Sequence, residues 1–202
     1  MNFDSFEGGF SWFPDEQLTR TSHALATDAG VWLIDPLDVP GALERAAALG
    51  DPAGVLQLFD RHERDCAKIA ARLQVPHLRL PAVAGGPFAI VPVLKLPRWH
   101  EVALWWPERR VLVVAEAIGT NSFYALGRGP AGVHPLLRLR PPGALRGYEP
   151  DHLLVGHGSG IHGPAAAAAL ERAYARTRRD LPALAGMLSA AARAAVTARR
   201  PR

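Results

Sequence analysis

The segment from residue 55 to residue 65 reads Val55-Leu-Gln-Leu-Phe-Asp60-Arg-His62-Glu-Arg64-Asp65. Its apolar first half is typical of a buried strand, and a helix is expected directly after it, over Arg61 to Leu73. The polar half allows a structural interpretation, because Asp60 can cap this helix and Glu63, three residues later, completes a capping box. It also allows a functional one, because His62 and Asp65 share a helical face just beyond a strand end, where ligands are commonly presented.

Strand-rich and helix-rich stretches alternate on both sides of this segment. Further strands are expected at His23–Thr27, Val31–Ile34, His77–Leu80, Ala89–Leu96, Glu101–Trp106, Val111–Val114 and His152–Val155. Further helices are expected over Gly41–Leu49 and, in the C-terminal part, over about 164–199. Residues Gly127 to Asp151 are rich in Gly, Pro and Arg and predict a long loop beside the functional cleft. Two strand-rich stretches, each followed by helix, predict one α/β domain over residues 1–202, with helices outside packed sheets.

Composition and charge exclude several classes of protein. The 202 residues include 23 Lys plus Arg and 19 Asp plus Glu, for a formal charge of +4. The excess comes from arginines near the C-terminus, so the rest of the chain is mildly acidic and a nucleic-acid-binding domain is not supported. No apolar run is long enough to span a membrane, and the acidic start does not suit a signal peptide. With Cys66 as the only cysteine, expected to be a buried thiol, we expect a cytoplasmic protein without disulfides.

The segment Gly158-Ser-Gly160-Ile-His-Gly163 matches the glycine pattern G-x-G-x-x-G of dinucleotide-binding folds. It follows an expected strand and precedes an expected helix. Such a fold then needs a second parallel strand ending in an acidic residue about 20 residues later. The chain offers only helix-like sequence up to Arg199, so no dinucleotide cofactor is expected.

The order and spacing of several short motifs resemble the metallo-β-lactamase fold family over about residues 10 to 180. The segment Gly30–Pro36 resembles the family's hairpin that ends in an Asp-containing turn, and Asp60–Asp65 stands in the place of its H-x-H-x-D-H motif. Val111–Glu116 resembles the strand that ends in Gly-Asp, Gly156–Gly158 resembles the near-terminal Gly-His motif, and His100–Leu112 resembles the segment after the family's middle histidine. The resemblance implies an α/β (α+β) fold, a four-layer αβ/βα sandwich of two packed mixed β-sheets with helices outside.

Most of the metal-ligand positions of the H-x-H-x-D-H motif are substituted. Only its second position, His62, keeps the family's residue, while Asp60, Arg64 and Asp65 stand at the first, third and fourth positions. Two closely spaced divalent ions that share a hydroxide carry out hydrolysis in the family. Arg64 would place a permanent cation where a ligand belongs, and we expect it to form an ion pair with Asp60, Asp65 or Glu116 instead.

Other ligand positions are kept or conservatively changed. His157 is retained, Glu116 replaces an aspartate, and His100 is a weaker match because Pro97-Arg-Trp99 lacks the usual glycine. If Arg64 points away from the site, the resemblance implies a mixed nitrogen and oxygen set that suits one Zn, Mn or Fe ion. That set consists of Asp60, His62, Asp65, Glu116 and His157. His152 and His162 flank the Gly-His motif and are candidate cleft residues, whereas His23, His77 and His134 are expected at the surface or as capping residues.

Three functions follow, and the sequence does not decide whether the protein is an enzyme. In the first, the degraded metal site has lost the dinuclear chemistry, and the protein is a non-catalytic or altered member that binds a small-molecule ligand without metal. In the second, it is a hydrolase of an ester, amide or phosphodiester with one divalent metal such as zinc. In the third, it is a protein interaction module that presents exposed aromatic side chains. The anchors of that module would be Trp12, Phe13, Trp99, Trp105 and Trp106, and its partner is unknown.

Overall fold

The computed structural model describes residues 1–15, 19–83 and 86–198, and of residues 191–192 and 194–198 only the backbone. Its N-terminal half forms a six-stranded sheet in the order β1-β2-β3-β4-β5-β6. The first four strands are antiparallel neighbours, and β4, β5 and β6 are parallel. The strands are β1 (Asn2–Phe6), β2 (Gly9–Phe13), β3 (Ser22–Thr27), β4 (Gly30–Ile34), β5 (Pro52–Gln57) and β6 (His77–Arg79).

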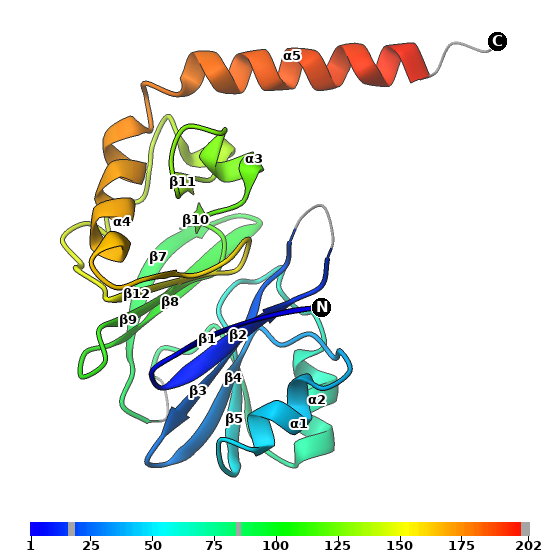
Figure 1. Ribbon diagram of the computed structural model, residues 1–202, viewed down its shortest axis with the longest axis vertical. Coiled ribbons are helices and arrows are strands. Elements are labelled where there is room, and N and C mark those ends of the chain that lie inside the picture. Colours follow the sequence, from blue (N-terminus) through cyan, green and yellow to red (C-terminus); the bar gives the residue numbers. More distant parts are fainter. Residues whose placement is uncertain (16–18, 84–85, 199–202) are drawn as a thin grey trace.

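The C-terminal half forms a five-stranded sheet in the order β13-β12-β9-β8-β7. Strands β9 and β12 are parallel, and the other neighbours are antiparallel. The strands are β7 (Ala89–Leu96), β8 (Trp99–Trp106), β9 (Val111–Val114), β12 (His152–Val155) and β13 (Ile161–His162). A small ribbon of β10 (Ile118–Gly119) and β11 (Gly132–Val133) lies beside this sheet (Figure 1).

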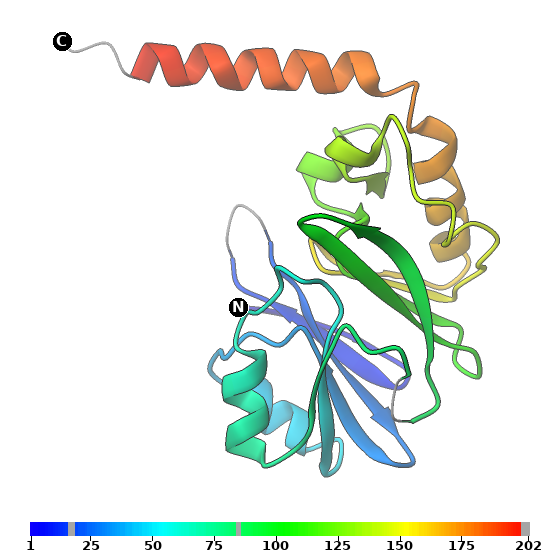
Figure 2. The ribbon, with the colours of Figure 1, turned by 180° about the vertical axis from the view of Figure 1, so that it is seen from behind.

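Helices cover the outer faces of the two sheets. Helices α1 (Ala42–Ala47) and α2 (Cys66–Leu73) lie on the side of the first sheet that faces away from the second (Figures 1 and 2). Helices α3 (Ser122–Ala125) and α4 (Ala165–Arg176) lie on the side of the second sheet that faces away from the first. Helix α5 (Leu181–Ala198) extends away from the two sheets. The larger apolar core fills the space between the sheets, with Leu25, Ile34 and Leu104 fully buried. The predicted sandwich of two mixed sheets with outer helices is therefore confirmed.

The structure differs in three places from what the sequence led us to expect. Helix α2 begins at Cys66, and its N-cap Asp65 makes no side-chain capping bond, so Asp60 and Glu63 form no capping box. The hairpin β1–β2 was not anticipated from the sequence. The stretch Gly127 to Asp151 is more than a covering loop, because it contains β11 and buries the side chains of Arg138 and Leu145 in the protein interior.

The aromatic residues proposed as interaction anchors lie mostly inside the protein. Trp12, Trp99 and Trp106 are buried, so these three cannot present an exposed binding surface in this fold. Among the residues described, no helix has both the length and the apolar character that a membrane span requires.

Position 156, directly after β12, requires glycine because the neighbouring backbone leaves no room for a side chain. A Cβ atom there would lie 2.1 Å from the Ala115 carbonyl oxygen and 2.9 Å from His62 Cε1. We expect Gly156→Ala to lower the free energy of unfolding by about 1–3 kcal/mol, because the added methyl group meets backbone that cannot move aside. Urea denaturation measures the change. Gly143→Ala, which places the methyl in open space, is the matched control, and equal losses in the two variants would contradict this assignment.

The buried His23 is expected to make the folded protein less stable in acid. The side chain is buried with Nδ1 2.8 Å from Ser11 Oγ, and burial, with a smaller effect of the Arg64 charge, lowers its pKa from 6.5 to about 3. The neutral ring therefore stabilises the fold above pH 6.5, and this contribution is lost as the pH falls toward 3.

We therefore expect His23→Gln to remove part of the wild-type acid dependence in this pH range, up to about 1.4 kcal/mol per pH unit. Denaturation curves recorded at several pH values, each referred to the value at pH 7.5, isolate this slope from any general loss of stability. Identical slopes in the two proteins would contradict a buried, neutral His23.

Candidate metal centre

The candidate site lies where the carboxyl ends of strands from both sheets converge. Asp35 follows β4, His62 follows β5 within a turn, Glu116 follows β9 and His157 follows β12. The hydrogen bond from Thr21 N to the Gly156 carbonyl joins the two sheets at this edge. Ligands of α/β sheets commonly bind outside the carboxyl ends of the strands, so the topology alone favours this location.

Three ligand-type side chains meet at the centre. Glu116 Oε2 lies 3.1 Å from His62 Nε2 and 3.1 Å from His157 Nε2. Among the residues described, these three form the one group of His, Cys, Asp or Glu whose ligand atoms all lie within 4.8 Å of one another. Burial tends to raise the pKa of Glu116, but the hydrogen bonds and charges of His157 and His62 outweigh it and lower the pKa well below its usual range. The carboxylate is therefore ionised and available as a ligand.

Asp35 fixes the orientation of His62. Its Oδ2 lies 2.8 Å from His62 Nδ1, and its Oδ1 accepts a hydrogen bond of 2.9 Å from Leu58 N. Burial alone would raise the pKa of Asp35, but the charge and hydrogen bond of His62, aided by Arg64, lower it. An ionised carboxylate behind a histidine holds the proton on Nδ1 and directs Nε2 toward Glu116.

Arg64 does not form the ion pair expected from the sequence. Its guanidinium instead donates to the backbone carbonyls of Thr21, Asp35 and Gly156. The backbone at Arg64 has a φ of 40°, a turn conformation that directs the side chain back under the strand ends. Burial lowers the pKa of Arg64 and the charge of Asp35 opposes this. Arg64 therefore occupies the space beneath the strand ends, and its donors are directed at backbone oxygens.

The second oxygen of Glu116 faces two residues that the sequence analysis did not assign to the site. Tyr124 Oη donates to Glu116 Oε1 at 2.8 Å, and His134 Nε2 lies 3.5 Å from the same oxygen. The Nδ1 atom of His134 accepts a hydrogen bond from Leu136 N, so the proton lies on Nε2. Burial lowers the pKa of His134 to about 4, which keeps the ring neutral. The expected capping role of His134 is confirmed, but the residue is buried beside the site and not at the surface.

Glu101 fixes the backbone that carries Glu116. The fully buried Glu101 accepts hydrogen bonds of 2.8 Å from Glu116 N and from Ala117 N through Oε1, and one of 3.0 Å from Trp99 Nε1 through Oε2. Burial raises its pKa to about 7 despite these bonds. Sequence reasoning missed this residue, although a carboxylate inside the otherwise apolar run from residue 99 to residue 106 was an available signal.

The other candidate residues lie outside the three-residue group. Asp65 Oδ2 accepts from Asp38 N, and the backbone N–H of Asp60 donates to the His100 carbonyl. His152 and His162 pair with each other, with 2.8 Å between their Nδ1 atoms, and His162 Nε2 also lies 3.1 Å from Asp4 Oδ2. Cys66 is buried, and burial raises the pKa of its thiol, in agreement with the expected buried thiol.

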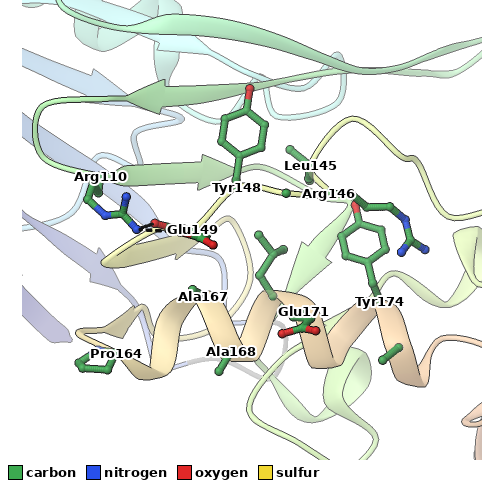
Figure 3. A pocket seen from close by; sticks show the side chains of 13 residues that line it. Arg110, Leu145, Arg146, Tyr148, Glu149, Pro164, Ala167, Ala168, Glu171 and Tyr174 are labelled. Atoms are coloured by element: carbon green, nitrogen blue, oxygen red, sulfur yellow. Dashed lines mark hydrogen bonds and ion pairs between the residues drawn. The ribbon is translucent and has the colours of Figure 1, made fainter.

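The centre opens into a cleft of about 370 Å³. Its lining includes Phe59, Arg61, His134 and Leu136 in addition to the three ligand-type residues. A larger cavity of about 700 Å³ lies between α4 and the segment around Tyr148 (Figure 3). The two cavities share no lining residue, and the larger one does not contain the His–Glu–His group. The cleft at the strand ends is therefore the candidate functional site.

Comparison with known proteins identifies the fold. No family model and no curated protein matches the chain. Among solved structures, the DIM-1 metallo-β-lactamase exposed to ceftazidime superposes with a TM-score of 0.58 at 11% identity, covering 88% of this chain and 96% of that one. The putative diflavin flavoprotein A 5 fragment from Nostoc sp. PCC 7120 gives a TM-score of 0.59 at 13% identity over 88% of this chain and 96% of that one.

A third structure is TTHA1623 in a di-iron-bound form, with a TM-score of 0.50 at 18% identity over 79% of this chain and 96% of that one. At such low identities the likeness concerns the backbone arrangement. The two sheets, the outer helices and the site at the strand ends agree with the resemblance inferred from the motifs. This chain has the metallo-β-lactamase fold.

Proposed function

We propose that the protein binds one divalent metal ion through His62, Glu116 and His157 and hydrolyses an ester, amide or phosphodiester with it. The observation that carries the proposal is the convergence of both histidine Nε2 atoms on the same oxygen of Glu116, at 3.1 Å each. Two imidazoles and one carboxylate are a common ligand set for zinc and for iron, and they leave coordination positions open.

The residues around the group fit such an ion. Asp35 holds His62 in the manner of the outer carboxylates that orient metal-binding histidines. Tyr124 and His134 both face Oε1 of Glu116, which leaves Oε2 directed toward the two histidines. Glu101 holds the Glu116 backbone in place through two hydrogen bonds. His62 and Glu116 thus have partners that hold the side chain or its backbone in place.

An ion held there would supply a Lewis acid that polarises the scissile group and activates water at neutral pH. The chain's own residues complement this chemistry. Arg64 places a fixed positive charge close to Asp35 and Glu116, which limits the net negative charge at the centre. His134 presents a neutral Nε2–H at the cleft, which can donate a hydrogen bond to negative charge that develops on the substrate but does not give up its proton.

A single ion is proposed because the side chains at the third and fourth positions of the motif make other contacts. Arg64 stands at the third position of the H-x-H-x-D-H motif and donates to three carbonyls. Asp65, at the fourth position, accepts from the backbone of Asp38. TTHA1623 has a di-iron-bound form, whereas the described residues of this chain contain one group that could hold a metal ion.

A second candidate is a metal-free member that binds a small molecule. It is favoured by the surroundings of Glu116, whose carboxylate already faces His62, His157, Tyr124 and His134. Tyr124 donates to Oε1, and an imidazole that carries a proton on Nε2 donates to Oε2, so a stable centre without metal is chemically reasonable.

Metal content separates the two candidates. Protein expressed with zinc, manganese and iron, and dialysed without chelator, is expected to hold about one equivalent of metal per chain, because the three ligands form one site. We expect His62→Ala and His157→Ala to lose this metal by elemental analysis. His100→Ala is the matched control and is expected to keep it, since His100 lies outside the group. Metal near zero in the wild type would contradict the hydrolase proposal and favour the metal-free one.

Asp35→Asn tests the orienting role of the buried carboxylate. The amide cannot hold the proton on His62 Nδ1 as strongly, so metal affinity is expected to fall by about 10–100-fold. Competition with a chromophoric chelator measures the affinity, and circular dichroism verifies that the variant is folded. Asp38→Asn removes a carboxylate that pairs with Lys68 and Arg72 instead, and is expected to leave the affinity unchanged. Equal affinities in all three proteins would show that Asp35 does not support the metal.

A further inference from the structure

Arg61 lies at the rim of the cleft and is held there by aromatic rings. Its guanidinium carbon lies 4.9 Å from the centre of the Phe59 ring and 5.2 Å from that of the Trp99 ring. Stacking on ring faces restrains the guanidinium plane, while its N–H donors point outward within that plane. Arg61 is therefore a positioned hydrogen-bond donor at the entrance to the site.

The charge of Arg61 is not used by a carboxylate in the described part of the chain. The ion pairs found there involve other arginines, such as Arg109 with Glu7 and Arg110 with Asp151. Arg61 also contributes, after burial, to the lowered pKa of His134, which agrees with its guanidinium facing the cleft. An exposed fork of donors beside a cleft favours an oxyanion as its partner.

Arg61 supplies a positive charge at the entrance of the cleft. The lining of the cleft also contains Arg64 and one carboxylate, Glu116. The charge of Arg64 is offset by the nearby carboxylates of Asp35 and Glu116, and Arg64 donates to three backbone carbonyls. The charge of Arg61 therefore remains for a ligand. An anionic ligand is favoured at Arg61 over a neutral or cationic one.

We propose that Arg61 binds an oxyanion, a carboxylate or a phosphate, of the substrate and so directs anionic esters into this cleft. The identification of this anion as a substrate rests on the proposed hydrolase function, but the anion site itself requires no metal. Leu136, which is 78% exposed and lines the same cleft, supplies an apolar contact for the rest of the molecule.

The larger cavity beside α4 does not offer a comparable site. Arg110 there is paired with Asp151 at 3.1 Å. Arg146 stacks on Tyr174 with its guanidinium carbon 4.4 Å from the ring centre (Figure 3). The two arginines of that cavity are accompanied by two carboxylates, Glu149 and Glu171, so its lining has no excess of positive charge.

The test is an anion titration of the metal-free protein, followed through the indole N–H resonance of Trp99 by NMR. Sodium phosphate and sodium acetate are added separately at pH 7 and constant ionic strength, with sodium chloride as the reference salt. We expect at least one oxyanion to shift the Trp99 resonance saturably. Arg61→Gln is expected to weaken that binding by about tenfold or more, with Arg61→Lys intermediate, because lysine keeps the charge but loses the planar fork. The tighter of the two anions identifies the class of oxyanion.

Arg109→Gln is the matched control. Arg109 also stacks on a tryptophan, with its guanidinium carbon 5.6 Å from the Trp106 ring, but lies outside the cleft and pairs with Glu7. We expect this variant to bind the anions as the wild type does. The inference is overturned if neither oxyanion gives a saturable shift beyond that of chloride, or if Arg61→Gln binds as tightly as the wild type.

The two proposals fail separately. One equivalent of metal without Arg61-dependent anion binding would overturn the anion site and leave the hydrolase proposal standing. If elemental analysis finds no metal in the wild type as purified, and anion binding still requires Arg61, the hydrolase proposal is overturned and the anion site stands.

Discussion

The buried guanidinium of Arg64 connects the parts of the molecule that form the site. It donates to the carbonyls of Thr21, Asp35 and Gly156, which lie at the ends of β3, β4 and β12 in two different sheets. These carbonyls are satisfied by a single planar group whose several donors suit such an arrangement. The relative position of the strand ends, and with it the distance between His62 and His157, depends on this interaction.

Because Arg64 donates to backbone carbonyls, the carboxylates of Asp35 and Glu116 remain in contact with the histidines. Had the guanidinium formed an ion pair with Glu116, as expected from the sequence, that carboxylate would be drawn from His62 and His157. Instead Arg64 acts on Asp35 and Glu116 through its charge, at no cost in their hydrogen bonds. The geometry of the His62–Glu116–His157 group is thus kept although an arginine stands at the third position of the motif. This arrangement is what the proposal of a single ion requires.

The sequence was informative where a repeating physical pattern existed. Alternating and β-branched runs gave most strands, and motif order gave His62, Glu116 and His157 as neighbours. Asp60 and Asp65 lie outside the three-residue group. Helix α2 begins at Cys66, and Asp65 Oδ2 accepts from Asp38 N. Tyr124 and His134 lie beyond β9 in segments without a clear repeat, so only tertiary structure shows that both face Glu116.

Glu116 also connects the His–Glu–His group with the wall of the cleft. Its two oxygens face different elements, with Oε2 toward the histidines at the strand ends and Oε1 toward Tyr124 and His134. His134 is the N-cap of a short turn of 3-10 helix that also carries the exposed Leu136 at the rim of the cleft. A change in that turn would therefore alter the surroundings of the Glu116 carboxylate and the exposed wall of the cleft together, because one short segment of backbone carries both His134 and Leu136.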